Sequence, residues 1–202
     1  MPYIASQFSF DLVANESIRE RILRCCEQAL ASGPIGHQQQ SELYRNFIAC
    51  NQEQSVEKAN ALATVRTSCA LFVRAIRQWC GASPAGPYVV STAMFGSMGN
   101  VSFKHPAWLD ATTEAPRPGD YFYIASSQTS VDGHTGIFIA EVSAGVWKTA
   151  EGGGGDGTQC RFGQRQIVGS KFANDPRTLW GWFDCEQVGL PLSPSVNALR
   201  QV

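Results

Sequence analysis

The sequence predicts an α+β fold in which N-terminal helices pack on a central antiparallel β-sheet. Apolar residues recur at helical spacing in the first half of the 202-residue chain, and short strand-like runs follow Pro116. No repeat or linker divides the chain, and 44% of its residues are hydrophobic. We therefore expect a single domain, with a helical extension over 1–60, a core over 61–185 and a tail over 186–202.

The helices are predicted from caps and apolar spacing. Ser17 and Glu20 have the spacing of a capping box, and Gly33-Pro34 ends the helix that follows. Further helical patterns cover about 38–49, 54–63 and 69–80. The last of these is apolar over most of its surface, which indicates a buried helix.

The strands are predicted from β-branched and aromatic runs between turns. These runs cover 121–125, 136–142, 146–150 and 178–183. A Ser-Ala-Gly turn joins the second and third runs, which indicates a hairpin. The glycines at 152–155 are interpreted as a loop, and they lack the Gly-Lys-Ser/Thr ending of a phosphate-binding loop.

Charge and cysteine content exclude several classes of protein. The chain has 16 basic and 17 acidic residues, without the positive surplus that nucleic-acid and anionic-membrane binders need. No apolar run is long enough for a membrane span, and the N-terminus does not read as a secretory signal. Seven irregularly spaced cysteines predict neither a disulfide framework nor a zinc site, so we expect no metal and no cofactor.

Three residues form the candidate catalytic set. Cys69 begins the buried helix, where free N–H groups and the helix dipole stabilise a thiolate. Backbone N–H groups at Cys69 and Ser68 are the candidates for an oxyanion site. His134 opens a strand and is the candidate base. Glu151 follows the next strand, where a hairpin returns it toward His134, and Asp156 is the alternative third residue.

The order of three motifs resembles a known family. Thr67-Ser68-Cys69-Ala70-Leu71-Phe72 is followed by Pro118-Gly119-Asp120-Tyr121-Phe122 and then by His134-Thr135-Gly136-Ile137-Phe138. This order resembles that of the NlpC-type cysteine peptidases and their CHAP amidase relatives, over about residues 60–185. The acidic position after one further strand is similar to that of the CHAP branch. Ser68 stands where the family often has Asp or Asn, and no second histidine follows His134.

The resemblance implies a papain-like fold and an amidase that cuts peptidoglycan stem peptides. It implies that Cys69 is the nucleophile, that His134 is the general base and later the general acid, and that Glu151 orients His134. Wall amidases without a leader are typically phage lysins or effectors injected by a type VI apparatus. We therefore expect synthesis in a bacterial cytoplasm, action in the periplasm of a target cell, and an immunity protein and a secretion-apparatus component as partners.

Three other interpretations stay open on the sequence. A protease, deamidase or acyltransferase acting on a protein would use the same dyad. A non-enzymatic papain-like binding module would bury Cys69. A structural or secretion-adaptor protein would use the helices over 16–63 as its working surface.

Overall fold

The structure is a computed structural model of the 202-residue chain. The residues that it describes are 10–31, 33, 35–36, 69, 72–73, 76–77, 80, 101–104, 114–127, 133–154 and 159–186. Their elements follow the order α1 (Ile18–Leu30), β1 (Ile35–Gly36), β2 (Val101–Lys104), β3 (Tyr121–Ala125), β4 (His134–Ser143), β5 (Val146–Gly154), β6 (Gln159–Val168), β7 (Lys171–Phe172) and β8 (Thr178–Phe183).

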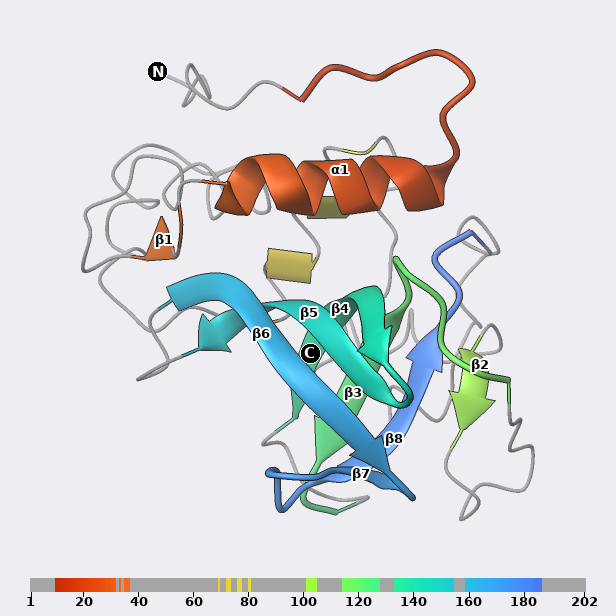
Figure 1. The fold of residues 1–202 in the computed structure, drawn as a ribbon, viewed down its shortest axis with the longest axis vertical. Coiled ribbons are helices and arrows are strands. Elements are labelled where there is room, and N and C mark those ends of the chain that lie inside the picture. Colours follow the sequence, from red (N-terminus) through yellow and green to blue (C-terminus); the bar gives the residue numbers. More distant parts are fainter. Residues whose placement is uncertain are drawn as a thin grey trace, which may run out of the picture.

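Six of the strands close into an antiparallel barrel (Figure 1). Strands β3, β4, β5 and β6 pair with their neighbours, β8 pairs with β3, and the short strand β7 pairs with both β6 and β8. Strands β1 and β2 extend the sheet from β6 and β8. Closure satisfies the backbone groups that the edges of an open sheet would leave unpaired.

The barrel corrects the predicted fold. A papain-like α+β fold, with N-terminal helices packed on a central sheet, is wrong for this chain, because the sheet curls onto itself and the described part is mostly β. Within that part α1 is the one helix defined from end to end. The helices expected over 38–49 and 54–63 lie outside the described residues.

Several local predictions are confirmed. The capping box at Ser17 and Glu20 begins α1, and the hairpin of β4 and β5 is present. Strands β3 and β8 have the predicted bounds. The described positions between Cys69 and Arg77 are helical. The prediction of a loop over 152–155 is wrong for 152–154, because β5 continues through these glycines with a register shift.

The apolar side chains form two clusters, one inside the barrel and one on its outer face. The inner cluster takes one residue or more from each of β3 to β8, namely Phe122, Ile124, Phe138, Trp147, Ile167, Phe172, Leu179 and Trp182. The outer cluster combines the opposite strand faces with the buried side of α1 and with Phe72, Val73, Ile76 and Cys80. The helical segment that carries Cys69 therefore packs between α1 and the barrel wall.

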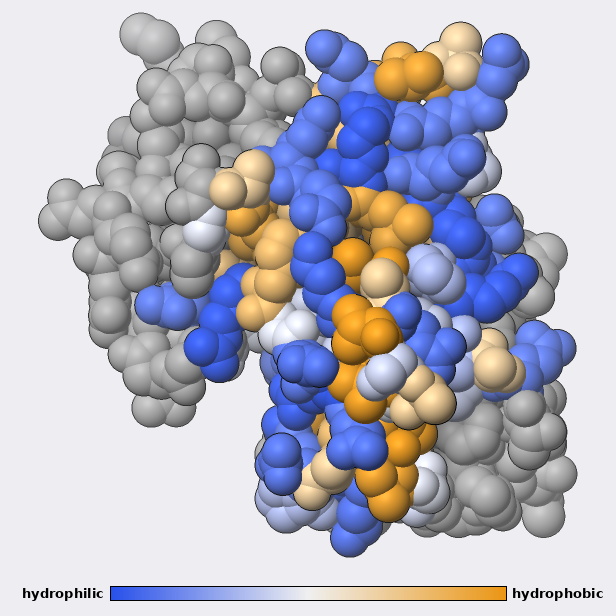
Figure 2. All heavy atoms as spheres, in the orientation of Figure 1, coloured by the Kyte–Doolittle hydropathy of each residue, from blue (hydrophilic) through white to orange (hydrophobic). Residues whose placement is uncertain are grey.

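Helix α1 crosses one side of the barrel (Figure 1). Its outward side is mainly hydrophilic, whereas hydrophobic side chains are visible below it over the strands (Figure 2). This is the distribution of an amphipathic helix that covers a core. No helix of the described residues has the length and apolar character needed to cross a membrane.

Arg19 fastens α1 to the barrel. Its guanidinium contacts Asp120 Oδ1 at 2.9 Å and Asp184 Oδ1 at 2.8 Å, and it also donates to the carbonyl of Pro118. Asp120 is fully buried and ends the Pro-Gly-Asp turn before β3. The Pro118-Gly119-Asp120 motif thus anchors the helix to the sheet.

Candidate functional site

One end of the barrel interior is polar. Alternation along β4 puts His134, Gly136 and Phe138 on the inner face, and alternation along β5 does the same for Glu151 and Thr149. Phe138 belongs to the inner apolar cluster, whereas the inward positions farther toward this end include the buried ionisable side chains of His134 and Glu151. We call this region the polar end of the barrel; it comprises His134, Glu151, Arg161, Gly163, Arg165 and Arg177.

Glu151 reaches His134 as the hairpin predicted. His134 Nε2 lies 2.7 Å from Glu151 Oε2, and both side chains are buried. In the register, Glu151 stands opposite Gly136 rather than opposite His134. A side chain at Gly136 would place its Cβ 2.7 Å from Glu151 Cγ and 2.6 Å from Phe122 Cζ. Because Gly136 of the His-x-Gly motif has no side chain, it leaves the space in which Glu151 reaches the imidazole.

Cys69 lies on the other side of His134. Its Sγ is 4.0 Å from the carbonyl oxygen of Gly133, and its side chain is hydrogen-bonded with the imidazole. Glu151 engages Nε2, so Nδ1 is the nitrogen left for the thiol. Cys69 is only half-buried, whereas the other described cysteines are buried. The structure thus brings Cys69, His134 and Glu151 together from three separate segments.

Electrostatics favour the protonated imidazole. Burial of His134 lowers its pKa, but the hydrogen bonds and negative charges of Cys69 and Glu151 outweigh burial and raise the pKa to about 9. Burial also raises the pKa of Glu151, yet hydrogen bonds and charge from Arg165 and His134 hold it well below its usual range. At neutral pH the arrangement therefore favours an imidazolium that is paired with the Glu151 carboxylate and hydrogen-bonded with Cys69.

Arg165 is a site residue that the sequence did not single out. It donates from Nε to Glu151 Oε1 at 2.9 Å and from Nη2 to Oε2 at 2.6 Å. Thr149 Oγ1 donates to the same Oε1 at 2.5 Å. With His134 on Oε2, both carboxylate oxygens are fully engaged, so Glu151 has one orientation. The sequence carries one signal for it, because Arg161, Gly163 and Arg165 occupy alternate positions and therefore share one face of a strand.

The network of charged side chains extends beyond Arg165, away from the imidazole. Arg165 Nη1 lies 3.0 Å from Asp175 Oδ2, and the guanidinium of Arg177 makes two hydrogen bonds to Asp175, each of 2.8 Å. Arg177 lowers the pKa of Asp175 to about 2, against the opposing effect of burial. Anion and cation thus alternate from Glu151 to Arg177, which fixes Arg165 from both sides.

A pocket of about 370 Å³ opens at the polar end of the barrel. Its lining consists of His134, Glu151, Gly153, Arg161, Gly163, Gln164, Arg165 and Arg177. Its volume lies in the range of pockets that take small molecules. Because His134 and Glu151 form part of its wall, any occupant lies next to these two members of the candidate catalytic set.

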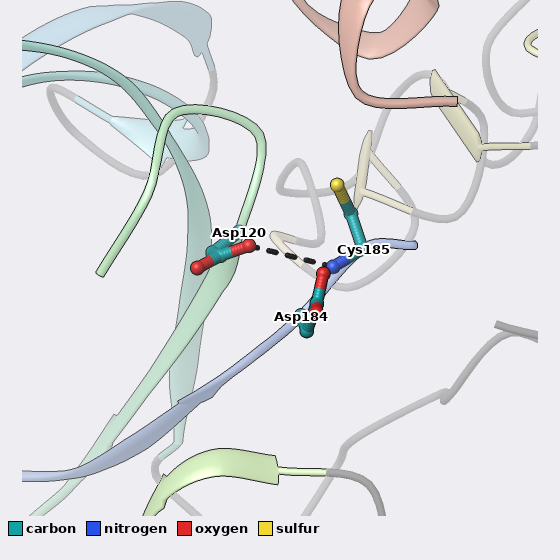
Figure 3. Close-up of side chains that lie close together, drawn as sticks. All are labelled: Asp120, Asp184 and Cys185. Carbon is teal, nitrogen blue, oxygen red and sulfur yellow. Dashed lines mark hydrogen bonds between the residues drawn. The ribbon is translucent and has the colours of Figure 1, made fainter. Parts of the chain in front are cut away.

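A separate cluster brings together Asp120, Asp184 and Cys185, whose possible ligand atoms lie within 4.8 Å of one another (Figure 3). Cys185 N is 3.4 Å from Asp120 Oδ1. Both carboxylates are already paired with Arg19, and Arg117 also contacts Asp184. We therefore assign these residues to the anchoring of α1.

Two predicted site residues lie outside the described residues. These are Ser68, the candidate oxyanion donor, and Asp156, the alternative partner of His134. Glu151 occupies the position for which Asp156 was the alternative, since it bonds the imidazole directly.

No protein-family model, curated protein or solved structure matches this chain. Its function is therefore inferred from the geometry of its side chains and from the order of its motifs.

Proposed function

We propose that this protein is a cysteine-dependent amide hydrolase that acts on the stem peptides of bacterial peptidoglycan. The observation that carries the proposal is His134, held between the half-buried thiol of Cys69 and the carboxylate of Glu151. A nucleophile, a base and a group that orients the base are the three parts that thiol acyl transfer requires.

The raised pKa of His134 sets the order of proton transfers. At neutral pH the imidazole already holds the proton, so the sulfur of Cys69 is available as a thiolate. The thiolate attacks the amide carbon and forms a C–S bond, and the carbonyl π electrons move to oxygen. Collapse of this tetrahedral intermediate breaks the C–N bond, and His134 gives its proton to the departing nitrogen.

The second half of the reaction regenerates the pair. Neutral His134 takes a proton from water, and the hydroxide oxygen attacks the thioester carbon. The C–S bond breaks, the acid product leaves, and thiolate and imidazolium are restored. Throughout, Glu151 keeps Nε2 occupied and Nδ1 directed at the sulfur, and its negative charge stabilises the imidazolium.

The substrate class rests on the motif order, not on the fold. The ordered Cys, Pro-Gly-Asp and His-x-Gly-Ile motifs resemble those of NlpC-type and CHAP enzymes, which cut wall peptides. Under this proposal the protein is delivered to the periplasm of a target bacterium as an antibacterial effector, or released as a lysin. An effector of this kind requires an immunity protein in the producing cell and a contact with the secretion apparatus.

The test is a digest of purified peptidoglycan with the wild type and Cys69→Ala, with products identified by mass spectrometry. Fragments from the wild type alone are expected, and their masses name the bond, either at the sugar lactyl group or within the stem. Equal urea midpoints for the two proteins control for folding. No fragments from sacculi of several stem compositions would refute the peptidoglycan substrate and leave a protein-directed cysteine enzyme or a binding module.

A further inference from the structure

The pocket at the polar end of the barrel has a surplus of positive charge. Arg165 is paired with Glu151 and Asp175, and Arg177 is paired with Asp175. Arg161 also lines the pocket, and it has no carboxylate partner among the residues that the structure describes. It stands beside Glu151 in the register of β5 and β6, yet Glu151 is already engaged by Arg165, Thr149 and His134.

The shape of the pocket leaves room for a ligand next to Arg161. Gly153 and Gly163 contribute no side chains to its lining. A Cβ at Gly163 would lie 3.1 Å from Thr149 Oγ1 and 3.3 Å from Glu151 Oε1, so larger residues would crowd the carboxylate network as well as the pocket. Arg161 itself is exposed, so its guanidinium can meet a ligand without losing an ion pair to any residue that the structure describes.

We infer that this pocket is a subsite for a free carboxylate of the substrate, with Arg161 as its ionic partner. The inference rests on the proposed function and specifies the substrate: a peptide with a carboxylate close to the scissile amide. A guanidinium binds a carboxylate through two parallel N–H···O bonds, which fix orientation as well as charge. Since His134 forms part of the wall and Cys69 lies beyond the imidazole, a carboxylate held there keeps the rest of the peptide beside His134, from where its scissile amide extends toward Cys69.

Stem peptides offer a matched pair of probes, because their carboxylates occur free or as primary amides. The experiment compares hydrolysis of a synthetic stem tetrapeptide with free carboxylates and of the same peptide with each carboxylate amidated in turn. The wild type is expected to prefer one free carboxylate by about ten- to a hundredfold in kcat/KM, the usual size of a charged hydrogen-bonded contact. Arg161→Gln is expected to bring this ratio close to one, chiefly through KM, and Arg161→Lys to restore part of it.

Lys171→Gln is the matched control, because it removes one positive charge from an exposed position on β7 outside the pocket. It is expected to keep the wild-type ratio, which separates a local contact from a change in net charge. A wild type that cleaves free and amidated peptides equally, or an Arg161→Gln protein that keeps the preference, would overturn the subsite and leave the proposed function intact.

Binding distinguishes the two proposals if hydrolysis fails. Calorimetry of the same peptides on Cys69→Ala measures affinity without turnover. Binding that depends on the free carboxylate and on Arg161, with no cleavage by the wild type, would support the subsite and count against the amide hydrolase. Neither cleavage nor Arg161-dependent binding would overturn both.

Discussion

Replacing Glu151 by Gln tests the charge pattern around His134 most sensitively. Gln keeps the size of the side chain and removes its negative charge. Loss of an opposite charge at hydrogen-bond distance is expected to lower the pKa of His134 by about one to three pH units. The imidazole signals in NMR spectra report this change directly.

The same change has a defined effect on stability. The pKa of His134 is raised from 6.5 to about 9, which corresponds to about 3 kcal/mol in the free energy of unfolding. Because the value is higher in the folded state, this stabilisation is fully present below pH 6.5 and is lost as the pH rises through 9. The cost of Glu151→Gln is therefore expected to be largest near neutral pH and below, and smaller above about pH 9.

Urea unfolding at several pH values measures this cost, with Glu27→Gln as the control. Glu27 is an exposed residue of α1 whose carboxylate contacts Lys148, so the same chemical change there leaves His134 untouched. A cost of Glu151→Gln that does not vary with pH, or an imidazole that titrates as in the wild type, would refute the assigned role of Glu151.

Three further changes have expected outcomes. Gly136→Ala forces a Cβ to within 2.7 Å of Glu151 Cγ, so it is expected to destabilise the protein by about 1–3 kcal/mol in urea titrations, more than Gly163→Ala does. Arg165→Met removes two hydrogen bonds from Glu151, and their loss raises the pKa of Glu151. The acid limb of the pH–activity profile is therefore expected to move to higher pH. Arg165→Lys is expected to move this limb less. An unchanged limb would show that Arg165 is only structural. Arg19→Met leaves the buried Asp120 without its cation and is expected to cost about 3–5 kcal/mol at neutral pH, measured by urea unfolding.

The elements that the sequence predicted are those with local signals. The capping box of Ser17 and Glu20 and the apolar spacing after it were enough to place α1. Apolar runs between turns were enough for β3, β4 and β8. Strand β6 was missed because most of its residues are polar, charged or glycine, and most of its side chains are not buried.

Closure of the barrel has no local signal. It depends on β7, a two-residue strand that pairs with β6 on one side and β8 on the other. An open sheet and a closed barrel give the same alternation along each strand, so strand patterns alone do not separate a papain-like sheet from this barrel.

The residues of the candidate site also divide into those that the sequence predicted and one that it missed. Cys69, His134 and Glu151 were found because motif order and hairpin geometry bring a nucleophile, a base and an acid together. Arg165 was missed because the alternate spacing of Arg161, Gly163 and Arg165 indicates a shared strand face but not which residues that face meets. The register of β5 and β6 pairs Arg165 with Trp147, and its long side chain reaches along the inner face of the barrel to the carboxylate of Glu151.

The most direct test of the central claim is the pH dependence of Cys69 alkylation by iodoacetamide, read by peptide mapping in the wild type and in His134→Ala. If Cys69 and His134 form a thiolate–imidazolium pair, the wild-type thiol is expected to react at pH 6, and His134→Ala to react only as the pH approaches the range of an ordinary thiol, about 8.5. The same profile in both proteins, or a Cys69 that is not alkylated at any pH, would contradict the pairing on which the proposed activity depends.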